Sequence, residues 1–394
     1  MGREAPTAPK FLWRKGCYTS GGTTTCDSGF SELGETWSGP AVVKIQAHSN
    51  PVLIFGGGYD AVSEDPEPPA TADTMGRMIY VLDAFDGSIV WTAGNAAASP
   101  TLNVTGMDFA IAADILAVDR LQTGYVDRAY AADVGGNVWR IDLGGTSTTN
   151  WAVWKIASVG GRTASSAGRK FLFPPDVVFG AQGTFDAVVI GSGDREHPLA
   201  TNAAASIANR AYMFMDPNTG TTGADLNIQE SDLVSVSATS TSTTIDLTGH
   251  KGWEMTLRAG EQVVNGPVVV AGQMIFATNQ PCASGQVDAN GECATSSDGA
   301  LSCGGNLGIA RRYDINYLTA APAGFTDEAG TAVRSVVATG GGFLPSPVSG
   351  VVEVNGNNYP FITDNPLGGG GVITPNINVP NKRYRTYWHE VLDK

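Results

Sequence analysis

A short stretch near the end of the first third of the chain has the outline of a calcium-binding loop. EF-type loops place oxygen ligands at positions 1, 3, 5, 7 and 9 and a glycine at position 6 for the tight turn. With Asp119 at position 1, Thr123 takes position 5, Gly124 position 6, Tyr125 position 7 and Asp127 position 9. Position 7 contributes a backbone carbonyl, so a tyrosine is compatible with the pattern. The spacing therefore predicts a metal site formed by Asp119, Thr123, Tyr125 and Asp127.

The same loop departs from the pattern at two ligand positions. Leu121 occupies position 3 and offers no oxygen, and Thr123 offers a neutral hydroxyl in place of a carboxylate. A calcium ion takes six to eight oxygen ligands, so two carboxylates make a weak site. Two interpretations stay open: a degenerate calcium site, or a connecting turn that has kept the shape of the loop without its ion.

Elsewhere the chain offers little that could do chemistry. The four histidines (His48, His197, His250 and His389) are scattered, and none forms a metal-binding pair. The densest polar group, Asp194-Arg195-Glu196-His197, has residue types suited to acid and base catalysis. The alternative is that its Asp and Arg pair with each other to shape a surface loop. We expect no enzyme activity and no organic cofactor.

The cysteines indicate an oxidising compartment. Cys17 and Cys26 flank a flexible segment rich in glycine and threonine, and a disulfide between them would hold it. Cys282, Cys293 and Cys303 lie together in a second Gly/Ser-rich insertion, where any two could pair. No cysteine pair has the short Cys-x-x-Cys spacing of zinc sites.

Composition narrows the class of protein and of partner. The chain has 394 residues with 50 glycines, 21 prolines and 16% charged residues, which is typical of a turn-rich, mostly β protein. Its net charge of −14 disfavours nucleic acid and anionic membrane surfaces as partners. No apolar run is long enough for a membrane-spanning helix. The start of the chain lacks a signal-peptide pattern, so we expect a fragment of a longer secreted protein.

A repeated pattern predicts the elements that position the loop. An apolar strand ending in Tyr-x-x-Asp, a glycine turn and a strand closing on tryptophan occur at 77–91 and again at 128–142. Similar strand–turn–strand units follow with drift at 185–216, 267–314 and 350–363. Short strands with Asp-Gly turns, recurring every 40 to 60 residues or so, are typical of β-propeller blades. We expect an all-β, distorted propeller of six to eight blades with long loop insertions.

The pattern also suggests how the chain is organised. Residues 1–35 are expected to form an N-terminal arm with the Cys17–Cys26 disulfide, and residues 36–394 the β-propeller. The acidic, proline-rich segment 61–74 is expected to be an exposed loop, and the Ser/Thr-rich segment 219–248 a loop or edge ribbon. A strand at 384–389 is expected to close the ring against the first blade. The insertions at 60–74, 193–209 and 281–305 are the expected contact surfaces, because they interrupt blades without adding core.

Several short motifs resemble the C-terminal domain of the PilY/PilC-type type IV pilus tip-associated adhesins, and their order covers nearly the whole chain from about residue 30. They are Thr36-Trp-Ser-Gly-Pro40, Phe55-Gly-Gly-Gly-Tyr59, Tyr80-Val-Leu-Asp83, Gly124-Tyr-Val-Asp127, Asp133-Val-Gly-Gly-Asn-Val-Trp-Arg140, Gly191-Ser-Gly-Asp-Arg-Glu-His-Pro198, Asn306-Leu-Gly308 and Tyr384-Arg-Thr-Tyr-Trp388.

This resemblance implies a modified seven-bladed propeller at the pilus tip, on the cell surface. It implies a non-enzymatic factor that binds minor pilins, supports pilus assembly, opposes retraction and adheres to a host or abiotic surface receptor. The family's calcium loop is similar to Asp-x-Asp-x-Asp-Gly-x-x-Asp, and its calcium state is linked to extension versus retraction of the pilus. Leu121 and Thr123 depart from that motif in this chain. The alternative is a quinoprotein-dehydrogenase-like propeller enzyme. That class usually has an adjacent cysteine pair, and no two cysteines of this chain are adjacent.

Overall fold

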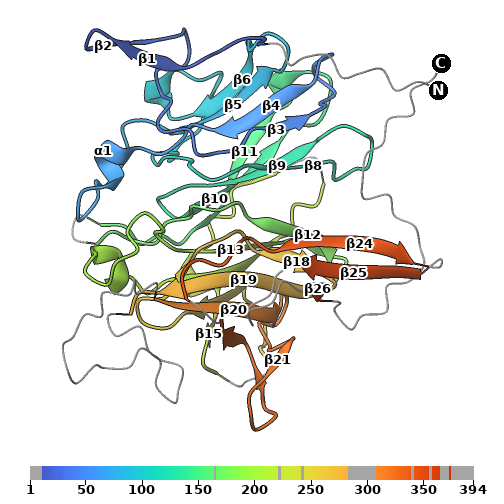
Figure 1. The fold of residues 1–394 in the computed structure, drawn as a ribbon. Coiled ribbons are helices and arrows are strands. Elements are labelled where there is room, and N and C mark those ends of the chain that lie inside the picture. The colour runs from blue at the N-terminus through green and yellow to red at the C-terminus, as the bar shows by residue number, and fades with distance from the viewer. Residues whose placement is uncertain are drawn as a thin grey trace, which may run out of the picture.

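The computed structural model consists almost entirely of β-strands (Figure 1). It describes residues 11–163, 166–220, 223–240, 244–282, 308–338, 341–354, 357–363 and 372–373. Its one α-helix within these ranges, α1 (Ala61–Glu64), has a single turn. Short 3-10 turns are found at η1 (Ala96–Ala98), η2 (Thr148–Asn150), η3 (Ala203–Ser206) and η4 (Glu230–Asp232).

The strands form successive sheets, and each sheet is built from neighbouring segments of the chain. The first sheet has the order β3-β4-β5-β6-β7 and the second has the order β11-β10-β9-β8. Their bounds are β3 (Ala41–Val43), β4 (Val52–Gly56), β5 (Met78–Asp83), β6 (Ile89–Gly94), β7 (Leu102–Asn103), β8 (Leu116–Val118), β9 (Arg128–Ala132), β10 (Asn137–Asp142) and β11 (Ala152–Ser158).

The third and fourth sheets repeat this arrangement, and Figure 1 shows the sheets succeeding one another in the order of the sequence. The third sheet has the order β12-β13-β14-β16-β15; the fourth has the order β17-β19-β20-β23, with β18 paired to β19. Their bounds are β12 (Asp176–Ala181), β13 (Phe185–Gly191), β14 (Arg210–Asp216), β15 (Val234–Ser237), β16 (Gly252–Thr256), β17 (Gln262–Val263), β18 (Val268–Val270), β19 (Gln273–Gln280), β20 (Ile309–Asn316) and β23 (Ser335–Val337).

The remaining strands form a smaller fifth sheet and two hairpins. The fifth sheet contains β24 (Val348–Val354), β25 (Asn357–Thr363) and β26 (Val372–Ile373). The hairpins pair β1 (Cys17–Ser20) with β2 (Thr23–Cys26), and β21 (Phe325–Thr326) with β22 (Ala332–Val333). Successive sheets of this kind are the blades of a propeller, which confirms the predicted fold class. The described residues do not establish the expected number of blades, and the expected closing strand at 384–389 lies outside them.

The hydrophobic core lies between consecutive sheets because each central strand buries both of its faces. Side chains alternate across a strand, so in β9 Ala129 and Ala131 face the first sheet while Tyr130 and Ala132 face the third. The cluster between the first two sheets includes Ile54, Val81, Trp91, Trp139 and Ile141; the next includes Val138, Val188, Tyr212 and Phe214; the third includes Met213, Trp253, Met274, Phe276 and Tyr313.

The aspartates that end the repeated Tyr-x-x-Asp motif clamp the following turns. Asp133 accepts hydrogen bonds from the Gly135 and Asn137 backbone N–H groups at 3.0 and 2.9 Å. It also accepts one from the Trp139 indole at 2.8 Å. Complete burial raises the pKa of Asp133 to about 6, against the opposing effect of these donors. Asp83 plays the same part in the first sheet, where it accepts from Phe85 N at 2.7 Å. The repeated aspartate therefore has the same role in both turns, where it accepts hydrogen bonds from the backbone N–H groups that follow it.

The N-terminal arm packs on the first sheet. The predicted Cys17–Cys26 disulfide is present, with an S–S distance of 2.04 Å. The segment between these cysteines forms the β1–β2 hairpin, whereas the sequence had suggested a loop without secondary structure. Phe30 stacks on Tyr80 of β5 with ring centroids 5.5 Å apart. The division at residue 35 therefore remains a prediction, since the arm shares a core cluster with the propeller.

Of two further segments that the sequence predicted, one differs from its prediction and one agrees with it. The acidic segment after β4 is only partly exposed: Val62 is an exposed apolar residue, whereas Ser63, Glu64 and Asp73 are buried. Buried counter-charges from other loops explain this difference and are described below. The Ser/Thr-rich segment 219–248 contains β15, which pairs in parallel with β16 at the edge of the third sheet, as expected for an edge ribbon.

Candidate binding site around the 119–127 loop

The loop that joins β8 to β9 is held by its own aspartates. Asp119 accepts hydrogen bonds from the backbone N–H groups of Thr123 and Gly124, at 2.9 and 2.6 Å. Gly124 has a φ of +86°, in the left-handed region that favours glycine. Thr123 turns inward on the loop, where its hydroxyl lies 3.4 Å from the Tyr125 carbonyl oxygen. The loop thus has the tight turn that its sequence predicts.

Asp127 clamps the opposite side of the loop. Its two carboxylate oxygens accept from the backbone N–H groups of Arg120 and Leu121, at 2.9 and 3.0 Å. The adjacent Val126 N–H donates to the Lys44 carbonyl oxygen at 2.8 Å, which ties the loop to the first sheet. The structure therefore brings all four predicted metal-site residues into one small loop.

The donor set in this loop is poor for calcium. Asp119, Thr123, Tyr125 and Asp127 supply two carboxylates, one hydroxyl and one carbonyl, which reach the lower limit of the six to eight oxygens that calcium takes only if both carboxylates bind through both oxygens. All four carboxylate oxygens already accept hydrogen bonds. In the part of the chain that the structure describes, no group of three or more His, Cys, Asp or Glu residues could hold a metal ion. These residues fit a self-closed turn better than a calcium site, and calcium binding here stays a prediction.

Two arginines fasten the loop to the third sheet. The Arg120 guanidinium, which adjoins Asp119 in sequence, pairs with Asp186 of β13 through Nε at 2.8 Å and Nη2 at 3.0 Å. Arg128, the first residue of β9, reaches the same Asp186 at 3.0 Å and Asp142 of β10 at 3.2 Å. Its Nη2 donates to the Gly220 carbonyl oxygen at 2.5 Å.

A third arginine completes this buried ionic junction between the second and third sheets. Arg140 is fully buried, and its Nη1 lies 2.6 Å from Asp216 at the end of β14. Its Nη2 lies 3.2 Å from Asp142, which also accepts from the Trp154 indole at 2.9 Å. Sequence reasoning missed this junction, although Arg140 and Asp142 stand two residues apart in a fully buried strand. The two charged residues at alternating positions of a buried strand were the signal that could have indicated buried ion pairs.

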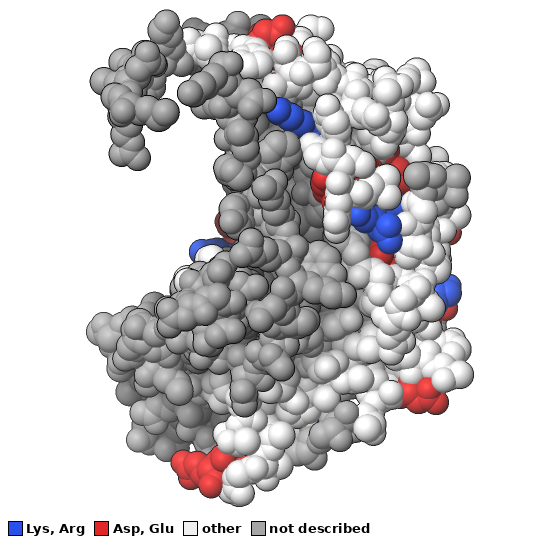
Figure 2. Space-filling model, turned by 90° about the vertical axis from the view of Figure 1, so that its right-hand side faces the viewer, with Lys and Arg blue, Asp and Glu red and all other residues white. Residues whose placement is uncertain are grey.

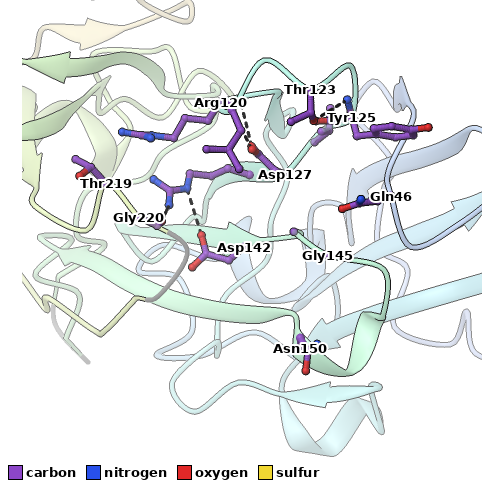
Figure 3. Close-up of a pocket in the computed structure, with 14 residues that line it drawn as sticks. Gln46, Arg120, Thr123, Tyr125, Asp127, Asp142, Gly145, Asn150, Thr219 and Gly220 are labelled. Carbon is purple, nitrogen blue, oxygen red and sulfur yellow. Dashed lines mark hydrogen bonds and ion pairs between the residues drawn. The ribbon is translucent and has the colours of Figure 1, made fainter.

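A cavity of 320 Å³ lies beside the loop, with the β10–β11 loop and Thr219–Gly220 forming other parts of its wall. The Arg128 guanidinium reaches Asp142 and the Gly220 carbonyl oxygen, and Figure 3 shows the Arg120 side chain extending toward the third sheet. Tyr125 and Gln46 line this cavity and also a neighbouring hollow of 350 Å³ that includes His48. The predicted metal-site loop is thus one wall of a concave surface.

A second ionic cluster lies at the other end of the sheets. Successive turns of an antiparallel sheet alternate between its two ends, so the β4–β5 and β13–β14 loops lie opposite the β8–β9 loop. Lys170, in the link before β12, pairs with Glu64 of α1 at 2.9 Å and with Asp194 at 2.8 Å. Arg162 binds both carboxylate oxygens of Glu64. These contacts bury the charged residues of the acidic segment after β4.

The predicted acid/base group at 194–197 takes part in this cluster. His197 Nδ1 lies 3.0 Å from Asp194, and this hydrogen bond raises the pKa of His197. Asp194 pairs with Lys170 and His197, whereas Arg195 lies over the Phe343 ring. The expected Asp–Arg pair is therefore wrong, because buried Lys170 offers Asp194 a better partner than an adjacent surface arginine.

Among the carboxyl groups of this cluster, Asp73 has a strongly raised pKa. Burial, followed by its contact with Glu64, raises the pKa of Asp73 to about 9. Its Oδ2 accepts from the Ala110 backbone N–H at 2.5 Å. Asp73 is therefore protonated at neutral pH. The cluster joins loops of the first, second and third sheets and closes this end of the molecule with buried, mutually paired charges.

The surface shown in Figure 2 carries few charged groups in its described part; some lie beside groups of opposite sign, and acidic groups at the lower edge stand apart. No extended patch of one sign is visible on the described atoms of this face. No helix among the described residues is long and apolar enough to cross a membrane. The described face therefore offers no broad electrostatic surface for a polyanion.

Comparisons with known proteins identify the fold. No family model matches the sequence, and no curated protein matches it either. Among solved structures, the C-terminal domain of Pseudomonas aeruginosa PilY1 matches with a TM-score of 0.61 and 14% sequence identity, over 90% of this chain and 74% of that one. A GH43 beta-xylosidase/alpha-arabinofuranosidase from a compost metagenome aligns with a TM-score of only 0.24 and 12% identity, over 87% of this chain and 94% of that one. This chain therefore has the β-propeller fold of the PilY1 C-terminal domain, as its motifs predicted.

Proposed function

We propose that this chain acts in a type IV pilus as a non-enzymatic tip and assembly factor that also adheres to surfaces. The observation that carries the proposal is the shared fold with the PilY1 C-terminal domain over nine-tenths of the chain. The Cys17–Cys26 disulfide supports an extracellular location, because such bonds persist in oxidising compartments. The motifs noted in the sequence support the same family.

Binding, and not catalysis, is the role that the ionic groups support. At the 119–127 loop, Arg120 and Arg128 are paired with Asp186 and Asp142. At the other end, Lys170, Asp194 and His197 are paired with one another and with Glu64. Such mutually compensated charges hold loops in place and leave little reactivity for acid or base chemistry.

For the pilin partner, we propose the end of the sheets that carries the long loops after β4 and β13. These loops are joined: Asn202 Nδ2 donates to Glu67 Oε1 at 3.1 Å, and the Ala203 N–H donates to Glu67 Oε2 at 3.2 Å. Each loop also presents an exposed aliphatic side chain, Val62 at 77% exposure and Leu199 at 61%. Apolar groups on a rigid polar frame are typical of a protein–protein contact.

Calcium modulation through the 119–127 loop is a separate and weaker part of the proposal. Isothermal titration calorimetry of the chain tests it directly. Saturable heat with calcium that Asp127→Ala abolishes would support an ion at this loop. A flat titration up to millimolar calcium would leave the loop as a turn closed by hydrogen bonds.

Pilus counts in cells test the proposed function. Deleting the gene for this chain should remove surface pili, and deleting the retraction motor as well should restore them. Complementation with Val62→Asp should fail to restore pili if the pilin contacts this end. Val42→Asp, which changes another exposed valine (66% exposed) on the edge strand β3, is the matched control and should restore them. Unchanged piliation after the deletion would contradict the assembly role.

A further inference from the structure

The charged residues that line the cavity beside the 119–127 loop have no capacity left for an ionic ligand. The Arg128 guanidinium contacts Asp142, Asp186, the Asn218 carbonyl oxygen and the Gly220 carbonyl oxygen. Arg120 forms a two-pronged pair with Asp186. A phosphate, sulfate or carboxylate would have to displace these buried partners, which disfavours an anionic ligand.

The polar groups left unpaired in the cavity wall are neutral. Of the described lining residues, Gln46 and Asn150 have side-chain amides that form no hydrogen bond within the described protein, and the Tyr125 hydroxyl forms none either. All three side chains are exposed. Amides and phenols donate and accept hydrogen bonds without charge, so they suit a ligand rich in hydroxyl or amide groups.

The rim of the cavity is apolar and partly aromatic. Leu121 is 55% exposed and Tyr125 is 43% exposed. A ligand that covered these large side chains would gain free energy from the burial of their apolar surface. Tyr125 borders both the cavity and the adjoining hollow. Figure 3 shows this ring pointing away from Asp142 and Gly220, on the side of Gln46.

We propose that this concave surface binds a neutral saccharide, with a sugar ring against Tyr125 and its hydroxyls hydrogen-bonded to Gln46 and Asn150. Sugar rings present apolar C–H faces that pack on aromatic rings, and vicinal hydroxyls that pair with planar amides. The two hollows that Tyr125 borders, of 320 and 350 Å³, give room for more than one sugar unit. The proposal rests on the proposed adhesive function, and it names the chemical class of the surface receptor.

Leu121 and Thr123 acquire a role in this account. A carboxylate at either position would place a further charge on the loop that walls the cavity. The residues that weaken the calcium motif thus add no further charge to the cavity wall. The same substitutions that remove ligands for a metal ion make the loop suitable for a neutral sugar.

A glycan array probed with the purified chain, followed by calorimetry with the best neutral oligosaccharide, tests the proposal. We expect saturable binding to neutral glycans that Tyr125→Ala weakens about tenfold or more, whereas Tyr125→Phe retains most of the affinity because it keeps the ring. Asn150→Ala should also weaken binding. Tyr18→Ala is the matched control, because Tyr18 is a similarly exposed tyrosine on the β1–β2 hairpin and should have no effect.

Two results would overturn the inference. One is the absence of binding to every neutral glycan by a chain whose thermal unfolding is normal. The other is glycan binding that does not depend on the proposed site, either because Tyr125→Ala and Asn150→Ala leave it unchanged or because only anionic glycans bind. Pilus counts with the Tyr125→Ala gene separate this inference from the proposed function: pili should form normally while attachment to glycan-coated surfaces falls. Normal pili with full glycan binding by this variant would refute the saccharide site alone.

Discussion

Replacing Arg140 by methionine should destabilise the propeller through its junction between the second and third sheets. Arg140 is fully buried and contacts Asp216 at 2.6 Å and Asp142 at 3.2 Å. Methionine fills a similar volume but leaves the Asp216 carboxylate buried without its cation. Removing one partner of a buried ion pair costs about 3–5 kcal/mol.

The expected change in melting temperature follows from the size of the chain. A melting entropy of about 2.1 cal/mol/K per residue gives about 0.8 kcal/mol/K for 394 residues. A loss of about 3–5 kcal/mol therefore lowers Tm by about 4–6 °C. Differential scanning calorimetry of Arg140→Met against the parent chain measures this shift.

Two further variants show whether the unpaired charge is the cause. Lys251→Met removes a cation whose pair with Asp232, at 3.2 Å, is largely exposed, so its Tm should change by less than about 1 °C. Adding Asp216→Asn to Arg140→Met should recover part of the loss, because the amide needs no counter-charge. A Tm for Arg140→Met equal to that of Lys251→Met would refute the reasoning, as would a double variant less stable than Arg140→Met.

Three other predictions concern separate parts of the molecule. The pKa of Asp73 is about 9 in the folded chain and near 4 in the unfolded chain, so its contribution to stability declines as the pH rises between these values. The Tm of Asp73→Asn should therefore rise relative to that of the parent chain from pH 5 to pH 9, and parallel Tm–pH curves would contradict this. Gly136→Ala should be far more destabilising than Gly124→Ala, because a Cβ at Gly136 meets the Gly160 backbone whereas one at Gly124 meets nothing within 4 Å; equal Tm values would show that the left-handed backbone alone sets the cost. Replacing both Cys17 and Cys26 by serine should make the exposed β1–β2 hairpin sensitive to proteases with little change in Tm, since neither strand lies in the core; a large fall in Tm would show that the hairpin is part of the cooperative unit.

The fold could be predicted because its strands repeat local signals. The Tyr-x-x-Asp and glycine-turn pattern marks turns in which Asp83 and Asp133 accept the backbone N–H groups that follow them. The Cys17–Cys26 pair was also predictable, because proximity in sequence brought the two thiols together. In both cases the atoms that interact are only a few residues apart.

The ionic clusters could not be predicted, because their partners are far apart in sequence. Arg140 meets Asp216, and Arg162 meets Glu64, only after successive sheets have packed against one another. The same limit explains the mistaken pairing of Asp194 with Arg195, since Lys170 comes from a different loop. For the 119–127 loop the sequence left a degenerate calcium site and a connecting turn both open, and the hydrogen bonds that Asp119 and Asp127 accept could not be read from it.

The location of this chain on intact cells tests the central claim most directly. Immunogold labelling of an epitope-tagged version, expressed from its own gene, can be viewed by electron microscopy alongside the pilus shaft. The account predicts gold particles at the distal ends of type IV pili, with no labelling of cells that lack the tag. Labelling along the shaft, or on the cell body of fully piliated cells with none at pilus ends, would contradict a role at the pilus tip.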